Sequence, residues 1–107
     1  MVRKTRKQIL GLELKGRLSD IIRILKRYGV KKAGIFGSYA TGEDNNKSDI
    51  DILIEVKKGT SLIGFVGIKL DLEDHLNKKV DLLTYKSIHP YLKKKILQEE
   101  VRIIWFH

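Results

Sequence analysis

Two aspartates separated by one residue are the most chemically informative feature of this 107-residue sequence. Asp49 and Asp51 open an apolar run, and residues two apart in a β-strand point to the same side, about 6.6 Å apart along the chain. Paired carboxylates suit hard divalent cations such as Mg²⁺, with phosphate oxygens completing the coordination. Two such ions, roughly 3.5–4 Å apart, can stabilise the attacking and leaving oxygens of a displacement at phosphorus. The pair therefore predicts a metal site for phosphate chemistry.

A Gly-Ser turn lies ten residues before these aspartates. Gly37 lets the backbone come close to a phosphate, and Ser38 offers a hydroxyl and a backbone N–H at the start of a short helix, where the dipole favours anions. A lone Gly-Ser is usually a plain turn, and a lone Asp-x-Asp is usually solvated surface. Their combination across a strand, a turn and a second strand is much more specific, and it favours a bound triphosphate.

A third carboxylate stands near the start of a later apolar run. Asp81 alternates with Val80 and Leu82, so in a strand it points away from these two residues. We expect Asp81 to bind one metal ion and to accept the proton of an attacking hydroxyl. The alternative for Asp81 alone is a solvated residue at a strand edge.

The elements that must position these residues follow from the apolar spacing and the helix-end signals. Gly29 and Asn77 suit helix C-termini, a Ser61 or Thr60 side chain suits a helix start, and Pro90 suits a first helical turn. We expect one α/β or α+β domain over residues 1–107, with residues 1–8 as a basic tail. Helices are predicted over 16–28, 61–76 and 90–100, strands over 30–36, 50–56 and 80–85, and an edge strand or docking segment over 101–106.

Composition narrows the possible protein classes. The chain has no cysteine, which excludes disulfides and thiolate metal sites, and no apolar run approaches the roughly 20 residues of a membrane span. A cytoplasmic protein is the default expectation. The net charge of +9 is uneven: residues 1–32 hold eleven Lys or Arg, whereas residues 33–56 hold Lys47 and five carboxylates. An acidic island in a basic chain fits a cation site that attracts anionic ligands, although most of the lysines are expected to be ordinary solvated surface.

The sequence resembles the DNA polymerase beta nucleotidyltransferase superfamily, in its minimal nucleotidyltransferase (MNT) branch. The resemblance rests on Gly37-Ser38, ten further residues and Asp49-Ile50-Asp51, with Val80-Asp81-Leu82-Leu83 as the strand of the third carboxylate. It covers roughly residues 16–105. It implies a small mixed sheet of three to four strands flanked by helices.

The resemblance also implies an activity: Mg²⁺-dependent transfer of AMP from ATP to a hydroxyl, with release of pyrophosphate. By position, Asp49, Asp51 and Asp81 take the metal and catalytic roles, and Gly37 and Ser38 take the triphosphate role. MNT proteins are often paired with a helical HEPN partner as antitoxin and toxin, and the active ones add AMP to a tyrosine of that partner. Many relatives read Gly-Ser-x-Ala-Arg-Gly, whereas this chain has Thr41 at the arginine position.

Two other functions remain open at this point. An MNT-like protein can neutralise a partner by contact alone, which Thr41 favours slightly. A nucleotidyltransferase acting on a small molecule or RNA usually needs an extra domain to hold the acceptor, and 107 residues leave little room for one. Nucleic-acid binding through the basic first helix is an alternative that is not favoured, and a homo-oligomer is a further alternative beside the HEPN-type partner.

Overall fold

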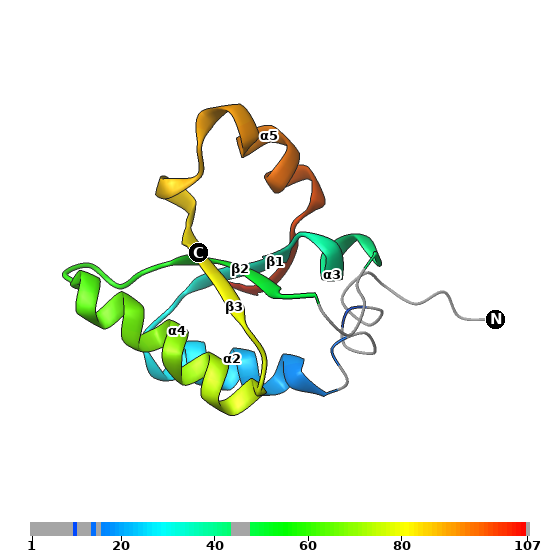
Figure 1. Ribbon diagram of the computed structural model, residues 1–107. Coiled ribbons are helices and arrows are strands. Elements are labelled where there is room, and N and C mark those ends of the chain that lie inside the picture. The colour runs from blue at the N-terminus through cyan, green and yellow to red at the C-terminus, as the bar shows by residue number, and fades with distance from the viewer. Residues whose placement is uncertain (1–9, 11–13, 15, 44–47, 107) are drawn as a thin grey trace.

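One mixed four-stranded sheet organises the computed structural model, which describes residues 10, 14, 16–43 and 48–106 (Figure 1). Within that part of the chain the strand order is β3-β2-β1-β4. β1 is antiparallel to both β2 and β4, and β2 is parallel to β3. The predicted fold class is confirmed, and the basic tail predicted over residues 1–8 lies outside the described residues. The elements are α2 (Arg17–Arg27), β1 (Lys32–Phe36), α3 (Ser38–Thr41), β2 (Ile50–Glu55), α4 (Leu62–Leu76), β3 (Val80–Thr84), the 3₁₀ turn η1 (Tyr85–Ser87), α5 (Pro90–Glu99) and β4 (Val101–Trp105).

The helix ends lie where the sequence signals place them. α2 gives way to Gly29, whose φ of 77° belongs to the left-handed region. α4 starts after Ser61, whose Oγ accepts the N–H of Gly64 at 3.0 Å, and stops at Asn77 with a φ of 51°. Pro90 occupies the first turn of α5. The apolar tail forms β4, an edge strand, so this half of the prediction for residues 101–106 is confirmed.

The main core lies between the sheet and the pair α2 and α4, which lie side by side against one face (Figure 1). In β2 every second residue, namely Ile50, Ile52 and Ile54, points into this core, as the alternation predicts. Leu10 and Leu14 also belong to the core, although they precede α2. The fully buried members with the largest side chains include Ile21, Ile24, Leu25, Ile35, Ile50, Ile52, Ile54 and Leu72.

A smaller apolar cluster covers part of the opposite sheet face. Leu53 is fully buried there, against Phe36 and Ile88, and Ile96 of α5 packs at its edge. α5 itself has no buried residue and stands on this side of the sheet (Figure 1). The face that carries the aspartates is therefore partly closed by α5 and η1, while the rest of it stays accessible.

Glu100, just before β4, has a buried carboxylate that makes contacts on the sheet face of the smaller apolar cluster. The Glu100 side chain is 3% exposed, accepts a hydrogen bond from the Tyr85 hydroxyl and lies 4.0 Å from Nε of Arg102. It occupies the space beside Gly34, where an added Cβ would overlap the carboxylate. The pairing of β1 with β4 shifts register at the same place, between Ala33 and Gly34. Burial and the hydrogen bond to Glu100 raise the pKa of Tyr85 well above its ordinary value.

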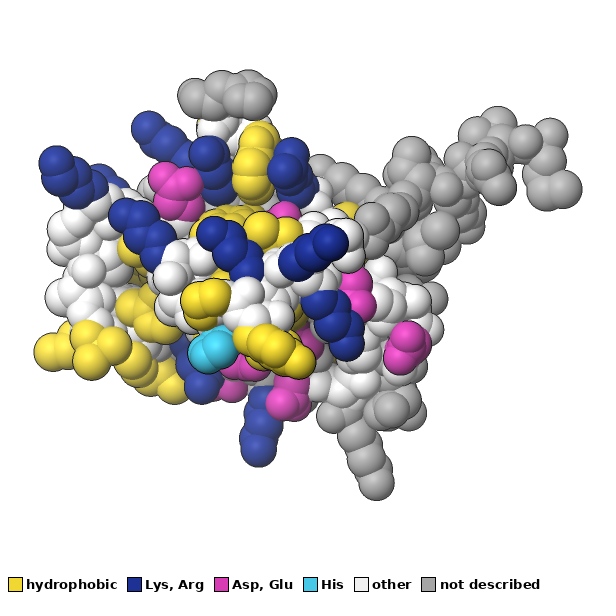
Figure 2. Space-filling model, turned by 90° about the horizontal axis from the view of Figure 1, so that it is seen from above, with side chains coloured by type: hydrophobic (Ala, Val, Ile, Leu, Met, Phe, Trp, Pro, Cys, Tyr) yellow, Lys and Arg dark blue, Asp and Glu magenta, His cyan; other side chains and the backbone are white. Residues whose placement is uncertain are grey.

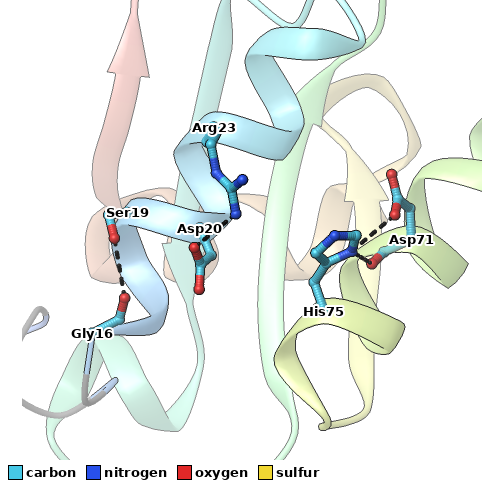
Figure 3. Close-up of polar contacts among 6 residues, drawn as sticks. All are labelled: Gly16, Ser19, Asp20, Arg23, Asp71 and His75. Carbon is cyan, nitrogen blue, oxygen red and sulfur yellow. Dashed lines mark hydrogen bonds and ion pairs between the residues drawn. The ribbon is translucent and has the colours of Figure 1, made fainter.

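Hydrogen bonds and ion pairs form within α2 and within α4, on the outer surfaces of these helices (Figure 3). Arg23 donates to Asp20 at 2.9 Å within α2, and Nδ1 of His75 lies 3.0 Å from the Asp71 carboxylate within α4. The Tyr28 hydroxyl donates to Asp71 at 2.9 Å and so links the two helices. Across the described part of the chain, no helix is both long and apolar enough to cross a membrane.

Candidate active site

Strand register brings two of the three predicted carboxylates together. Asp51 of β2 is paired with Asp81 of β3, and the two strands are parallel. Register partners in neighbouring strands point to the same face and lie about 5 Å apart between Cα atoms. Both aspartates therefore emerge on the face opposite α2 and α4. Asp49, two residues before Asp51, precedes the first residue of β2 and is exposed.

The Gly-Ser turn touches the same carboxylate. Phe36, the last residue of β1, is the antiparallel partner of Asp51, so Gly37 follows directly beside it. Gly37 has a φ of 71° and a ψ of −152°, a conformation that residues with a side chain avoid. An added Cβ at Gly37 would overlap the Asp51 carboxylate. Glycine is thus required here both for the backbone conformation and for the close approach of Asp51.

Ser38 begins α3, the short helix expected after the turn. The Gly37 carbonyl accepts the N–H groups of Ala40 and Thr41 at 3.1 and 3.2 Å, which closes the first turn. The N–H groups at the start of a helix have no partner within the helix itself, so this end can face an anion. Tyr39, one residue further, is only 5% exposed and belongs to the core, so it is a packing residue.

Asp49, Asp51 and Asp81 lie close enough together for their negative charges to repel one another. Burial, followed by the charges of Asp81 and Asp49, raises the pKa of Asp51 from 3.8 to about 6. These are the conditions under which a nearby cation stabilises the ionised form. The site therefore favours a positively charged ligand over an empty, fully ionised state.

The carboxylates of the acidic site suit Mg²⁺ held in an open site, and do not suit a metal ion enclosed by protein ligands alone. Among the described residues, no three His, Asp or Glu side chains already form a metal-binding group. Mg²⁺ is usually held by one or two carboxylates, with water and substrate phosphates as the other ligands. Asp51 and Asp81 supply such a pair, Asp49 stands two residues before Asp51, and α3 begins next to Gly37, which lies against Asp51.

A separate pocket of about 690 Å³ lies elsewhere on the molecule. Its lining runs over residues 54–60 and 84–86, at the carboxyl ends of β2 and β3. The aspartates stand at the other ends of these strands, so this pocket is not part of the acidic site.

The family comparison decides the identity of the fold and its chemistry. Residues 19–105 match the family model described as polymerase beta, nucleotidyltransferase. The chain belongs to this family. The resemblance noted in the sequence is therefore confirmed, and the chain is a nucleotidyltransferase domain.

Individual relatives agree with this assignment. A protein of Methanocaldococcus jannaschii, provisionally named protein adenylyltransferase MJ0435, is 55% identical over 84 residues, which are 78% of this chain and 90% of that protein. Protein adenylyltransferase MntA of Thermococcus cleftensis is 37% identical over 73% of this chain and 79% of its own length.

Solved structures show the same fold. One provisionally described as a minimal nucleotidyltransferase has a TM-score of 0.72 at 31% identity and covers 82% of this chain and 90% of its own. Another, a tri-AMPylated Shewanella oneidensis HEPN toxin in complex with its MNT antitoxin, has a TM-score of 0.69 at 20% identity, over 87% of this chain and 73% of the matched chain. At that identity the second likeness concerns the fold alone.

Proposed function

We propose that this nucleotidyltransferase is a Mg²⁺-dependent protein adenylyltransferase that transfers AMP from ATP to a tyrosine hydroxyl of a HEPN-type partner, and so acts as an antitoxin. The single observation that carries the chemistry is the contact of Gly37 with Asp51, which is itself in register with Asp81. A protein acceptor of the HEPN type is supported by the relatives, which are named protein adenylyltransferases, and by a structural neighbour that consists of an AMPylated HEPN toxin and an MNT antitoxin. The choice of tyrosine rests on the resemblance noted in the sequence.

The positions of the three aspartates suggest which of them bind the metal and which accepts a proton. Asp49, Asp51 and Asp81 would hold the metal, and bound Mg²⁺ supplies charge neutralisation for the triphosphate and the departing pyrophosphate. Asp81 stands on the edge strand β3 and is exposed, so an acceptor hydroxyl can reach it. It takes the hydroxyl proton as the acceptor oxygen bonds to the α-phosphorus and pyrophosphate leaves.

The Gly-Ser turn holds the other end of the nucleotide. The Ser38 hydroxyl and the first N–H groups of α3 bind the β- and γ-phosphates. Gly37 keeps the backbone close enough to Asp51 for phosphate and metal ligands to meet. This arrangement orients the triphosphate for in-line attack, which is a large part of catalysis in phosphate transfer.

Transfer of label from ATP to a purified HEPN-type partner tests this function. With α-labelled ATP and Mg²⁺, we expect the partner to gain AMP on tyrosine and Asp49→Asn or Asp51→Asn to lower the rate by at least about a hundredfold. Asp20→Asn removes a carboxylate of the same type from the outer surface of α2 (Figure 3) and should transfer at the wild-type rate. Equal labelling by wild type and Asp51→Asn would refute the proposal.

A second candidate is neutralisation by contact without catalysis. It is favoured by Thr41, whose exposed hydroxyl donates to the Ser38 carbonyl at 3.3 Å and offers no cation for phosphate. Under this alternative, Asp49→Ala neutralises the partner as well as wild type does. Under the enzymatic function, Asp49→Ala still binds the partner and no longer neutralises it.

A further inference from the structure

Lys78, in the loop between α4 and β3, differs from the many cationic side chains that stand out from the surface. Figure 2 shows Lys and Arg side chains extending outward from the side of the molecule that carries α5. Lys78 is instead half-buried, and its Nζ donates to the Ser48 carbonyl at 2.7 Å. The same ammonium lies over the Tyr39 ring, 5.6 Å from the ring centre, within the range of a cation–π contact. One lysine side chain therefore contacts two segments that are far from it in the sequence.

The first of these segments carries Asp49. Asp49 precedes the first residue of β2, so the hydrogen bonds of the strand begin only after it. Lys78 binds the carbonyl directly before Asp49, and the carbonyl of Lys79 accepts the N–H of Ile50, directly after it, at 3.0 Å. The backbone on both sides of Asp49 is thus held by two consecutive residues at the start of β3.

The second segment is α3, which follows the Gly-Ser turn. Tyr39 comes directly after Ser38, is 5% exposed and belongs to the main core. A ring that is packed in this way moves only together with its helix. The contact of Lys78 with Tyr39 therefore links the position of α3 to that of the segment before β2.

The backbone that carries Lys78 is itself held on both sides. Nε of Arg17 donates to the Leu76 carbonyl at 3.1 Å, which ties the end of α4 to the start of α2. Oε2 of Glu73 accepts the N–H of Val80 at 2.9 Å, which ties the start of β3 to α4. Lys78 therefore extends from a loop whose two ends are fixed to the rest of the fold.

We propose that Lys78 is a positioning residue of the nucleotidyltransferase site, which keeps Asp49 and α3 in the relative placement that binding of a metal–triphosphate needs. It acts through the Ser48 carbonyl and the Tyr39 ring, without contacting ATP. The inference rests on the proposed function, because that function gives Asp49 and Ser38 their roles. Without Lys78, each segment keeps its own local contacts, but their relative position is less restricted, and the productive arrangement is populated less often.

Titration calorimetry with Mg²⁺ and α,β-methylene-ATP, an analogue that cannot release pyrophosphate, tests this role without an acceptor protein. Lys78→Met keeps the apolar stem and removes the cation, and we expect it to weaken nucleotide binding about tenfold, as loss of one hydrogen bond from a charged group commonly does. Lys78→Arg keeps a cation that can donate to the Ser48 carbonyl and lie over Tyr39, and should restore most of the affinity. Lys79→Met is the matched control, since Lys79 carries the same charge, is exposed and keeps its carbonyl in the variant; it should bind as wild type does.

Amide hydrogen exchange of the ligand-free protein gives a measurement that does not depend on nucleotide. The Ile50 N–H is bonded to the carbonyl of residue 79, and the Thr41 N–H is bonded to the Gly37 carbonyl. We expect Lys78→Met to speed exchange at Ile50 and Thr41 severalfold, because both segments lose a contact that opposes local opening. Amides in the middle of α2 should exchange as they do in wild type.

Four outcomes would contradict the proposal. Equal affinities in Lys78→Met and Lys79→Met would overturn it, and so would faster exchange in α2 that matches the change at Ile50, since Lys78 would then only stabilise the fold. Tighter binding by Lys78→Met would show that the lysine acts by repelling the metal. A wild type that binds no Mg²⁺ and nucleotide would overturn this inference and the proposed function together. Binding as expected with no transfer of AMP to a HEPN-type partner would contradict the proposed function alone, because the affinities are measured without an acceptor.

Discussion

Asp51 is the residue on which the other parts of the candidate site converge. It lies against Gly37, stands in register with Asp81, and has the pKa of its carboxyl raised by burial and by two neighbouring aspartates. A half-buried carboxylate beside two like charges is unfavourable without a cation. Carboxylates whose pKa is raised in this way are common at functional sites, which supports the role proposed for Asp51.

Gly37→Ala is expected to damage the site while leaving most of the fold intact. The added Cβ would overlap the Asp51 carboxylate, and φ would have to leave 71°. A displacement of about 1 Å in a catalytic group can cost roughly a hundredfold in rate, so we expect a loss of that order in kcat/KM for AMP transfer. Gly59→Ala is the control, since Gly59 also has a positive φ of 91° but no neighbour within 4 Å. An equal loss of activity in both variants would contradict this reading.

Asp51→Asn is expected to stabilise the metal-free protein in a pH-dependent way. The folded pKa of Asp51, about 6, lies above the 3.8 of the unfolded chain, so ionisation costs stability. That cost is absent well below pH 3.8, grows as the pH rises, and is complete above about pH 6. The full shift corresponds to roughly 3 kcal/mol, and partial exposure reduces this to about 1 kcal/mol.

Denaturant unfolding in EDTA at several pH values measures this effect. We expect Asp51→Asn to exceed wild type by about 1 kcal/mol at pH 7.5 and by much less at pH 4. Asp20→Asn, which removes an exposed carboxylate paired with Arg23, should show no such gain. A gain for Asp51→Asn that is equal at both pH values would show that ionisation of Asp51 is not its cause.

At the scale of single elements, the link between β4, η1 and β1 depends on one buried carboxylate. Tyr85→Phe removes the hydroxyl that donates to Glu100 and leaves that carboxylate buried with one partner fewer. Loss of such a hydrogen bond typically costs about 1–3 kcal/mol, and we expect a drop of that size in the free energy of unfolding. Tyr91→Phe, at a residue 88% exposed on α5, should change stability by less than about 0.5 kcal/mol. Urea unfolding of wild type, Tyr85→Phe and Tyr91→Phe under the same conditions measures these two changes in the free energy of unfolding.

The elements themselves were predictable because each has a local cause. The alternation in 50–56, the glycine after α2, the Ser61 cap, Asn77 and Pro90 all act within a few residues of the boundary that they define. The sequence predicts that Asp81 joins Asp51 at one metal site, but it does not predict the register that pairs Asp51 of β2 with Asp81 of β3. The metal and catalytic roles of these residues stay predictions.

Other features required the tertiary structure. Gly34 leaves space for Glu100, and nothing near either residue in the sequence shows that they meet. The turn η1 depends on a reciprocal cap, in which Thr84 Oγ1 accepts the Ser87 N–H and Ser87 Oγ accepts the Thr84 N–H. A Glu before an apolar strand is usually exposed to solvent, so nothing in the sequence predicts the burial of Glu100.

For the whole molecule, stability comes from two apolar layers of unequal size on the two faces of the sheet. Leu72 is fully buried in the large layer under α2 and α4, and Leu53 is fully buried in the small layer beside the acidic site. We expect Leu72→Ala and Leu53→Ala each to cost about 2–5 kcal/mol in the free energy of unfolding. Leu53→Ala should also lower AMP transfer, because Leu53 lies two residues from Asp51 on the same strand face.

Urea unfolding together with a transfer assay, at low micromolar concentration, compares these variants. Leu62→Ala is the control, since Leu62 is 78% exposed and its loss should change stability by less than about 0.5 kcal/mol. If Leu72→Ala lowered transfer by folded protein as much as Leu53→Ala does, the small layer would have no special role in the site.

The position of β3 at the margin of the sheet has a consequence for how the enzyme can be silenced. Asp51 belongs to the central strand β2, with β1 and β3 as neighbours, whereas the strand of Asp81 pairs with β2 alone. Displacing this outermost strand would move Asp81 away from Asp51 and leave the antiparallel strands β2, β1 and β4 paired. A ligand that displaced β3 would therefore alter the acidic site without contacting the Gly-Ser turn.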